Sequence, residues 1–165
     1  MPSRLPTRCF VSALALTCVA TPVVVPARAQ STPRPTRFEV TVDPATRSGP
    51  LTGRLIVVVT KNGQSEPRMQ IAPQGPALFA IDLDQLRAGQ AAIVDTSALA
   101  YPISLAKLPP GEYHVQAIVN VYEQVKRADG KSVWVHFPHE GTQEVVQIAA
   151  GNVYSEPQRV RVGDG

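Results

Sequence analysis

The chain has 165 residues, a formal net charge of +3 and two cysteines. Three arginines and both cysteines, at positions 4, 8, 28, 9 and 18, lie within the first 29 residues. Removing those three of the 16 basic residues leaves 13, which equals the 13 acidic residues, and no thiol remains. The rest of the chain therefore lacks the positive charge typical of a nucleic-acid binder, and it has no residue for a disulfide or a cysteine zinc site.

The first 29 residues have the pattern of a secretory signal peptide. Two arginines precede an apolar run over residues 10–20, and the segment ends in Ala27-Arg28-Ala29, a small-residue pattern that signal peptidase cleaves. We predict cleavage between Ala29 and Gln30, and hence a protein that is secreted or periplasmic. The apolar run is shorter than the about 20 residues that a spanning helix needs.

Cys18 would be the acylated residue of a lipoprotein. The three residues before it, Ala-Leu-Thr, match the usual approach to such a cysteine poorly, so we expect no lipidation. Cleavage leaves 136 of the 165 residues, a length that suits one domain burying roughly two-thirds of its unfolded surface. Residues 30–36 are rich in proline and small polar residues, which predicts a disordered leader, and we place the domain at residues 37–163.

Seven segments of this domain have the composition and period of β-strands. In them apolar side chains recur at every second position, or β-branched residues fill both faces, and turn residues separate the segments. The predicted strands cover residues 38–42, 53–61, 77–83, 91–95, 112–125, 132–137 and 157–162. Residues 99–107 are expected to contain a short helical turn and no more, because Pro102 interrupts them.

The Asp129-Gly130 pair predicts a two-residue hairpin loop. With that loop, His136 would lie opposite Glu123, where the two could form a cross-strand ion pair. Trp134 would lie opposite Val125.

About seven short strands separated by turns predict an all-β fold, a β-sandwich of immunoglobulin-like or transthyretin-like type. The segment Leu-Pro-Pro-Gly-Glu at residues 108–112 leads directly into Tyr113, at the start of the clearest strand. A tyrosine in this place forms the tyrosine corner of such sandwiches, in which its hydroxyl bonds to upstream backbone. The alternative is that Tyr113 is an ordinary core aromatic.

No catalytic constellation is present in the sequence. There is no G-x-S-x-G elbow and no glycine-rich phosphate loop, so we expect no enzymatic activity and no cofactor. His136 and His139 are too few for a zinc site, which needs three or four ligands, and we predict no metal.

Two other charged pairs have ordinary structural explanations. Asp82 and Asp84 alternate with apolar residues, as the solvated face of a strand requires, although paired carboxylates also serve acid–base chemistry or calcium binding. Arg159 and Arg161 alternate on the last strand, where such charges protect a sheet edge from pairing, although they could also receive an anionic partner.

A weak candidate ligand site consists of aromatic residues. Tyr122, Trp134 and Tyr154, with His136, could form a binding platform of the kind found in carbohydrate-binding modules. The alternative is that Trp134 belongs to the core.

Four stretches of the chain resemble a known family. They cover residues 38–44, 66–71, 101–134 and 151–162, and the most distinctive are the long strand from Tyr113 and the run Tyr-Ser-Glu-Pro-Gln-Arg-Val. The resemblance is to the N-terminal, non-catalytic β-sandwich domain of secreted bacterial proteins of the α/β-hydrolase esterase type. In that family a hydrolase domain follows the sandwich, and residues 1–165 contain no counterpart of it, so the resemblance transfers no catalytic residue.

These observations together lead to a functional expectation. We expect an exported, non-catalytic β-sandwich that acts as an accessory or interaction module toward an esterase-like protein or a cell-surface polymer. Two alternatives stay open: the chain is the N-terminal part of a truncated or split secreted esterase, or it is a carbohydrate-binding module.

Overall fold

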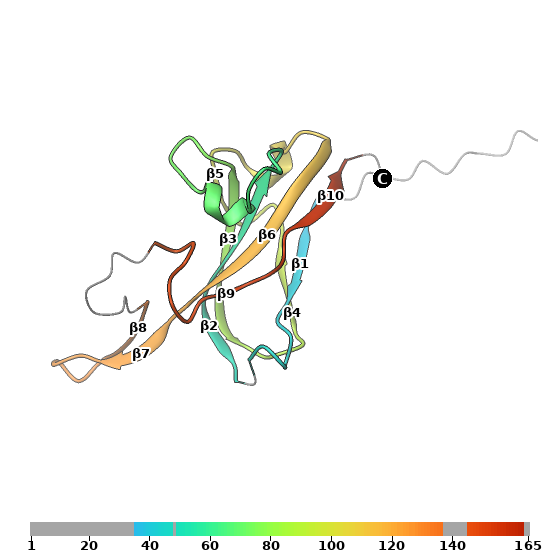
Figure 1. Cartoon of the computed structure of the whole chain (residues 1–165). Coiled ribbons are helices and arrows are strands. Elements are labelled where there is room, and N and C mark those ends of the chain that lie inside the picture. Colours follow the sequence, from blue (N-terminus) through green and yellow to red (C-terminus); the bar gives the residue numbers. More distant parts are fainter. Residues whose placement is uncertain (1–34, 48, 137–144, 164–165) are drawn as a thin grey trace, which may run out of the picture. The chain divides into compact units, whose positions relative to one another are not determined.

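The strands pair antiparallel into one large sheet and two smaller sheets of two strands each (Figure 1). The computed structural model describes residues 35–47, 49–136 and 145–163. The large sheet has the order β10-β6-β2-β3-β5, with β9 also paired to β6; the small sheets are β1–β4 and β7–β8. The elements are β1 (Phe38–Thr41), β2 (Leu51–Thr60), η1 (Pro67–Gln70), β3 (Ala77–Leu86), β4 (Ala91–Val94), β5 (Leu99–Tyr101), η2 (Leu105–Lys107), β6 (Gly111–Val121), β7 (Glu123–Lys126), β8 (Ser132–Val135), β9 (Val153–Tyr154) and β10 (Gln158–Val162).

The fold is an all-β sandwich, which confirms the predicted fold class. Every predicted strand segment contains a strand, and the helical turn expected within residues 99–107 is η2, a single 3-10 turn. The structure adds the short strands β5 and β9 and divides the segment 112–125 into β6 and β7, giving ten strands in the described part of the chain. No helix in the described part of the chain is long and apolar enough to span a membrane.

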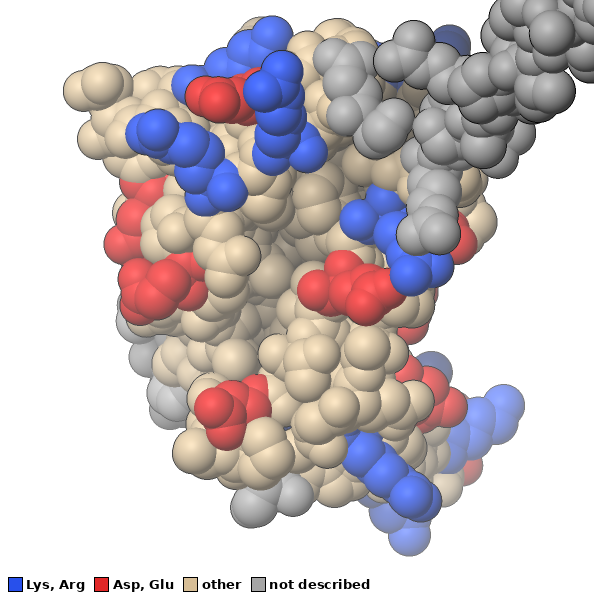
Figure 2. Space-filling model, turned by 90° about the vertical axis from the view of Figure 1, so that its right-hand side faces the viewer, with Lys and Arg blue, Asp and Glu red and all other residues tan. Residues whose placement is uncertain are grey.

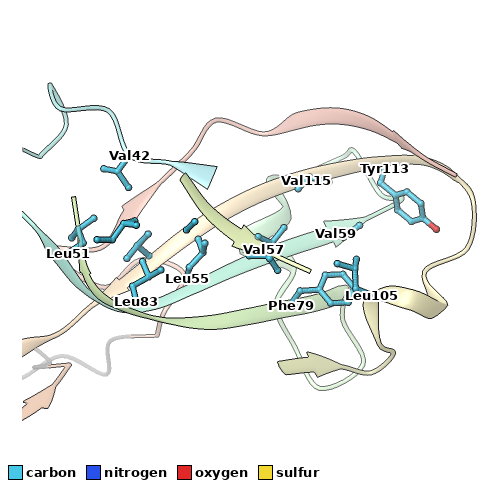
Figure 3. Close-up of a cluster of buried hydrophobic side chains, with 14 of the residues drawn as sticks. Val42, Leu51, Leu55, Val57, Val59, Phe79, Leu83, Leu105, Tyr113 and Val115 are labelled. Carbon is cyan, nitrogen blue, oxygen red and sulfur yellow. The ribbon is translucent and has the colours of Figure 1, made fainter. Parts of the chain in front are cut away.

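The core lies between the large sheet and the β1–β4 pair. It is built from inward side chains of β2, β3 and β6, among them Leu55, Phe79 and Val119, together with Val94 of β4 (Figure 3). Phe38 of β1 stacks on Phe79 with ring centroids 6.4 Å apart. β2 is a central strand between β3 and β6, and most of its residues are buried on both faces, as its composition predicted.

The clearest predicted strand breaks at Tyr122, where its pairing with β2 ends. β6 pairs with β2 as far as Gly53 opposite Val121, and the Tyr122 N–H then donates to the Thr52 carbonyl at 2.9 Å. Gly53 is required at this point, since a Cβ on it would lie 2.2 Å from the Asn120 carbonyl oxygen. Beyond Tyr122 the chain leaves the large sheet and pairs with β8 instead.

The predicted register of the β7–β8 hairpin is wrong by one residue. Glu123 faces Val135, and Trp134 faces Gln124 rather than Val125. The loop is longer than Asp129-Gly130, because the Arg127 N–H donates to the Lys131 carbonyl at 2.8 Å and Gly130 has a φ of 82°. A longer loop with glycine in the left-handed region shifts the pairing and puts His136 beyond the last pair, so it cannot be the partner of Glu123.

Tyr113 makes the hydrogen bond of a tyrosine corner. Its ring is buried at the end of the core, and its hydroxyl donates to the Pro109 carbonyl oxygen, four residues upstream, at 2.8 Å. The ammonium of Lys61 lies 5.4 Å from the centre of the same ring. The hydroxyl thereby ties the proline-rich turn to the start of β6.

We predict that Tyr113→Phe lowers the free energy of unfolding by about 1 kcal/mol, because the ring stays packed while the Pro109 carbonyl loses its donor. Tyr101→Phe is the matched control: its hydroxyl also donates to a proline carbonyl, that of Pro73, but this side chain is 51% exposed and water can replace the bond. Urea unfolding of both variants measures the difference. Equal losses in the two variants would contradict a special role for the corner.

Candidate functional site

The aromatic residues predicted as a weak ligand site do not form a platform of stacked rings. Trp134 on β8 is 42% exposed and Tyr154 on β9 is 51% exposed, so neither is a core residue. Within the described residues, however, the only ring-to-ring contact is Phe38 with Phe79. The Tyr154 ring is instead covered by the Arg68 guanidinium, 4.0 Å from the ring centre, and Tyr122 lies at the junction of β6 and β7.

The His136 ring contacts backbone in the structure. The His136 Nδ1 atom lies 3.1 Å from the Val121 carbonyl oxygen, and its buried Nε2 atom has no partner. His139 lies outside the described residues, as do Ala29 and Gln30 of the predicted cleavage site. Among the residues that the structure describes, no group of three His, Cys, Asp or Glu side chains could hold a metal ion.

Asp82 forms a cross-strand ion pair. Arg54 of β2 lies directly opposite it and donates from Nε and Nη2 to its two carboxylate oxygens, at 2.8 and 3.2 Å. These hydrogen bonds lower the pKa of Asp82 and raise the pKa of Arg54. Both side chains are solvated, so this is the exposed strand face that the alternation of Asp82 and Asp84 indicated.

Arg159 and Arg161 lie on an edge strand. β10 is the last strand of the large sheet, and both arginines are exposed on it. Within the described residues neither forms a salt bridge. Their position is the one in which charged side chains hinder further strand pairing.

A groove of about 310 Å³ with a largely apolar lining lies on the open side of the sandwich, and we call it the β1–β10 groove. The β1–β4 pair is narrower than the large sheet beneath it, so the space between β1 and β10 is not filled by a strand of the described chain. Figure 2 views this side of the molecule, where the surface is hollowed between groups of charged side chains. Its apolar lining consists of Phe38, Val40, Val57, Val115, Ala117 and Val160.

The far wall of the groove is shaped by a bulge between β9 and β10. Tyr154 faces Ile118 and Gln158 faces Val115, so three residues on the edge oppose two on β6. Ser155 fills the gap: its N–H donates to the Ala117 carbonyl, and its Oγ accepts from the Ala117 N–H, both at 3.0 Å. A smaller hollow of about 190 Å³ adjoins the groove at Ala117 and Ser155 and extends it toward β9.

A buried polar network on the opposite face of β6 fixes the position of the bulge at Ser155. Gln116 is 1% exposed, and every polar atom of its amide is bonded. Its Oε1 accepts from the Arg68 N–H at 3.0 Å, while its Nε2 donates to Glu66 Oε2 at 2.9 Å and to the Ser155 carbonyl at 2.8 Å. Arg68 donates to the same carboxylate at 2.7 Å and to the Gln147 carbonyl. These bonds tie η1 and the C-terminal segment to the sheet.

Sequence analysis did not find the groove or this network. The alternation in β1 and β10 was visible, but nothing in it shows that these two edges face one another. Gln116 alternates with the apolar residues of β6 and shares a face with His114 and Asn120, and the structure buries it because η1 and the segment around Ser155 cover that face.

Comparison with known proteins identified no match: no protein-family model, curated protein or solved structure matches this chain. Its function therefore has to be argued from its own residues.

The network makes stability depend on pH through Glu66. Its hydrogen bonds from Gln116 and Arg68 lower the pKa of this carboxyl from an ordinary value of about 4.5. The stabilising contribution is present above pH 4.5 and is lost as the pH falls through the lower pKa of the folded protein.

We predict that the stability difference between the wild type and Glu66→Gln is constant near pH 7 and shrinks below about pH 4.5. Urea unfolding of both proteins between pH 3 and 7 measures it. Asp84→Asn is the control, since it removes one negative charge away from the network. A difference for Glu66→Gln that does not change with pH would show that the network does not depend on the charge.

Proposed function

We propose that this protein is exported and acts as a non-catalytic module that binds another molecule through the β1–β10 groove. The observation that supports this most directly is the incomplete cover of the core along the groove. Phe38, Val40, Ala117 and Val160 pack against the core but stay partly exposed. Apolar surface that a sandwich leaves open in this way is typical of interaction sites.

The groove is suited to recognition rather than to chemistry. Its polar lining consists of Thr41, Ser155, Gln158 and an ion pair between Arg37 and Glu39, whose atoms lie 2.6 Å apart. The Ser155 hydroxyl is occupied by backbone hydrogen bonds, and none of the described histidines lines the groove, so the described residues place no nucleophile with a base there. In keeping with the resemblance to esterase-associated sandwiches, we propose an esterase-like protein or a cell-surface polymer as the bound molecule.

We predict that the purified protein hydrolyses p-nitrophenyl acetate and butyrate only at the background rate, because no activated nucleophile lines the groove. Absorbance of released nitrophenolate measures the rate. The Ser155→Ala and His136→Ala variants serve as comparisons. Turnover well above background that either substitution abolishes would refute the non-catalytic proposal.

The binding proposal is tested by site-specific photo-crosslinking in the cells that export the protein. Gln158 lines the groove, whereas its neighbour Arg159 is exposed but does not line it. A photo-reactive residue at position 158 is expected to give a discrete adduct that position 159 does not give. Mass spectrometry of the adduct identifies the bound molecule, and Gln30 at the N-terminus of the recovered protein would establish export.

Equal crosslinking at the two positions, or none at position 158, would mean that the groove is not the binding surface. Carbohydrate binding would then be the proposal to test next, because Trp134 and Tyr154 are exposed and crosslinking at positions 158 and 159 does not probe them.

A further inference from the structure

We infer that the occupant of the β1–β10 groove is an extended segment of another polypeptide, which adds as a third strand to the free edge of β1. The inference rests on the proposed function and names the chemistry of the bound partner. It follows from the hydrogen-bonding groups, the shape and the surroundings of the groove.

The groove follows the backbone edge of β1 rather than one face of it. Phe38 and Val40 point toward the core and Glu39 and Thr41 point outward, yet all four line the groove. Residues of both faces can border one space only where that space runs along the side of the strand. No residue of β4 lines it, so the groove lies on the side of β1 away from its partner.

The main-chain groups on this side of β1 lack partners within the described residues. β1 pairs with β4 alone, from Phe38 opposite Val94 to Thr41 opposite Ala91. Among the residues that the structure describes, no other backbone hydrogen bond involves residues 38–41. In an antiparallel pair the N–H and C=O groups of alternate residues point to the partner, so the remaining ones point into the groove. A strand edge of this kind is a template for another strand.

The floor of the groove selects for a strand with alternating side chains. Val57, Val115 and Ala117 form an apolar surface beneath the gap, and β10 closes the far side with an edge that also pairs on one side only. An added strand would lie about 4.8 Å from β1, with every second side chain on this floor and the others in solvent. The segment should therefore be apolar at alternate positions.

The neighbouring parts of this chain are poor candidates for the role. Residues 30–36 lead directly into β1, and two of the seven, Pro33 and Pro35, have no N–H to donate. A second copy could offer its own β1, but four residues per strand are far fewer than the roughly 20–30 residues a side of a stable interface. A separate peptide needs no such area, because main-chain hydrogen bonds and the apolar floor hold it.

The inference is tested by selecting nine-residue peptides from a random phage-displayed library against the whole exported protein, without assuming any sequence. Enriched peptides are expected to carry apolar residues at alternate positions. Each is then synthesised in two N-methylated forms, one methylated on its odd and the other on its even amides. Only one set of amides faces β1, so one form should bind about tenfold or more weakly and the other nearly as well as the parent.

Protein variants supply an independent arm of the test. Val40→Asp puts a charge beside the groove and should weaken binding by about tenfold or more. Ile93→Asp puts the same charge on the exposed face of β4 and should change it by no more than about twofold. Amide hydrogen exchange should show new protection at alternate residues of β1 when a selected peptide is bound.

The inference is overturned if no peptide is enriched, if both N-methylated forms bind alike, or if Val40→Asp and Ile93→Asp bind equally well. If position 158 still crosslinks to a glycan or lipid in that case, the groove remains the binding surface and only the identity of its occupant is wrong. If position 158 crosslinks no better than position 159, the proposed function fails as well.

Discussion

The mismatch in width between the two layers is the constraint on which the rest of this structure depends. The large sheet presents an apolar face built from β2, β3 and β6, and among the described strands only β1 and β4 cover it, with η2 at one end (Figure 3). Because a sandwich is stable only when such faces are covered, the uncovered strip beside β1 is either filled by other atoms or left as exposed apolar surface. The groove, its free strand edge and the partly exposed side chains along it all follow from this difference in width between the two layers.

β6 organises the structure around that strip. Its inward face supplies Val115 and Ala117 to the floor of the groove, while its outward face carries Gln116, which joins η1 and the C-terminal segment to the sheet. The bulge at Ser155 depends on hydrogen bonds to Ala117, so the floor and the far wall are parts of one network. Such a fully bonded network gives the groove a fixed wall, which lowers the entropic cost of binding an extended segment.

Much of the fold could be predicted from the sequence because strand formation depends on local patterns of apolar, β-branched and turn residues. The alternation around Val40, the β-branched run in β2 and the proline-rich turn before Tyr113 each indicate their structure without reference to distant residues. The prediction failed for the hairpin register, because loop length and not the Asp129-Gly130 pair sets it, and for β9, which exists only because β6 offers it a partner. Gln116 shows a related limit: the polarity of a residue by itself favours an exposed position, and only contacts with η1 and the segment around Ser155 bury this one.

The sequence by itself therefore determined the all-β class, the positions of seven strand segments and the turn that Tyr113 holds. These depend on interactions between residues that are neighbours in the chain, or on the period with which apolar side chains recur. Only the tertiary structure decided that β1 and β10, from opposite ends of the domain, border one groove with unpaired edges. Which strand edges meet, and which remain free, depends on the pairing of segments far apart in the sequence, and local patterns carry no information on that choice.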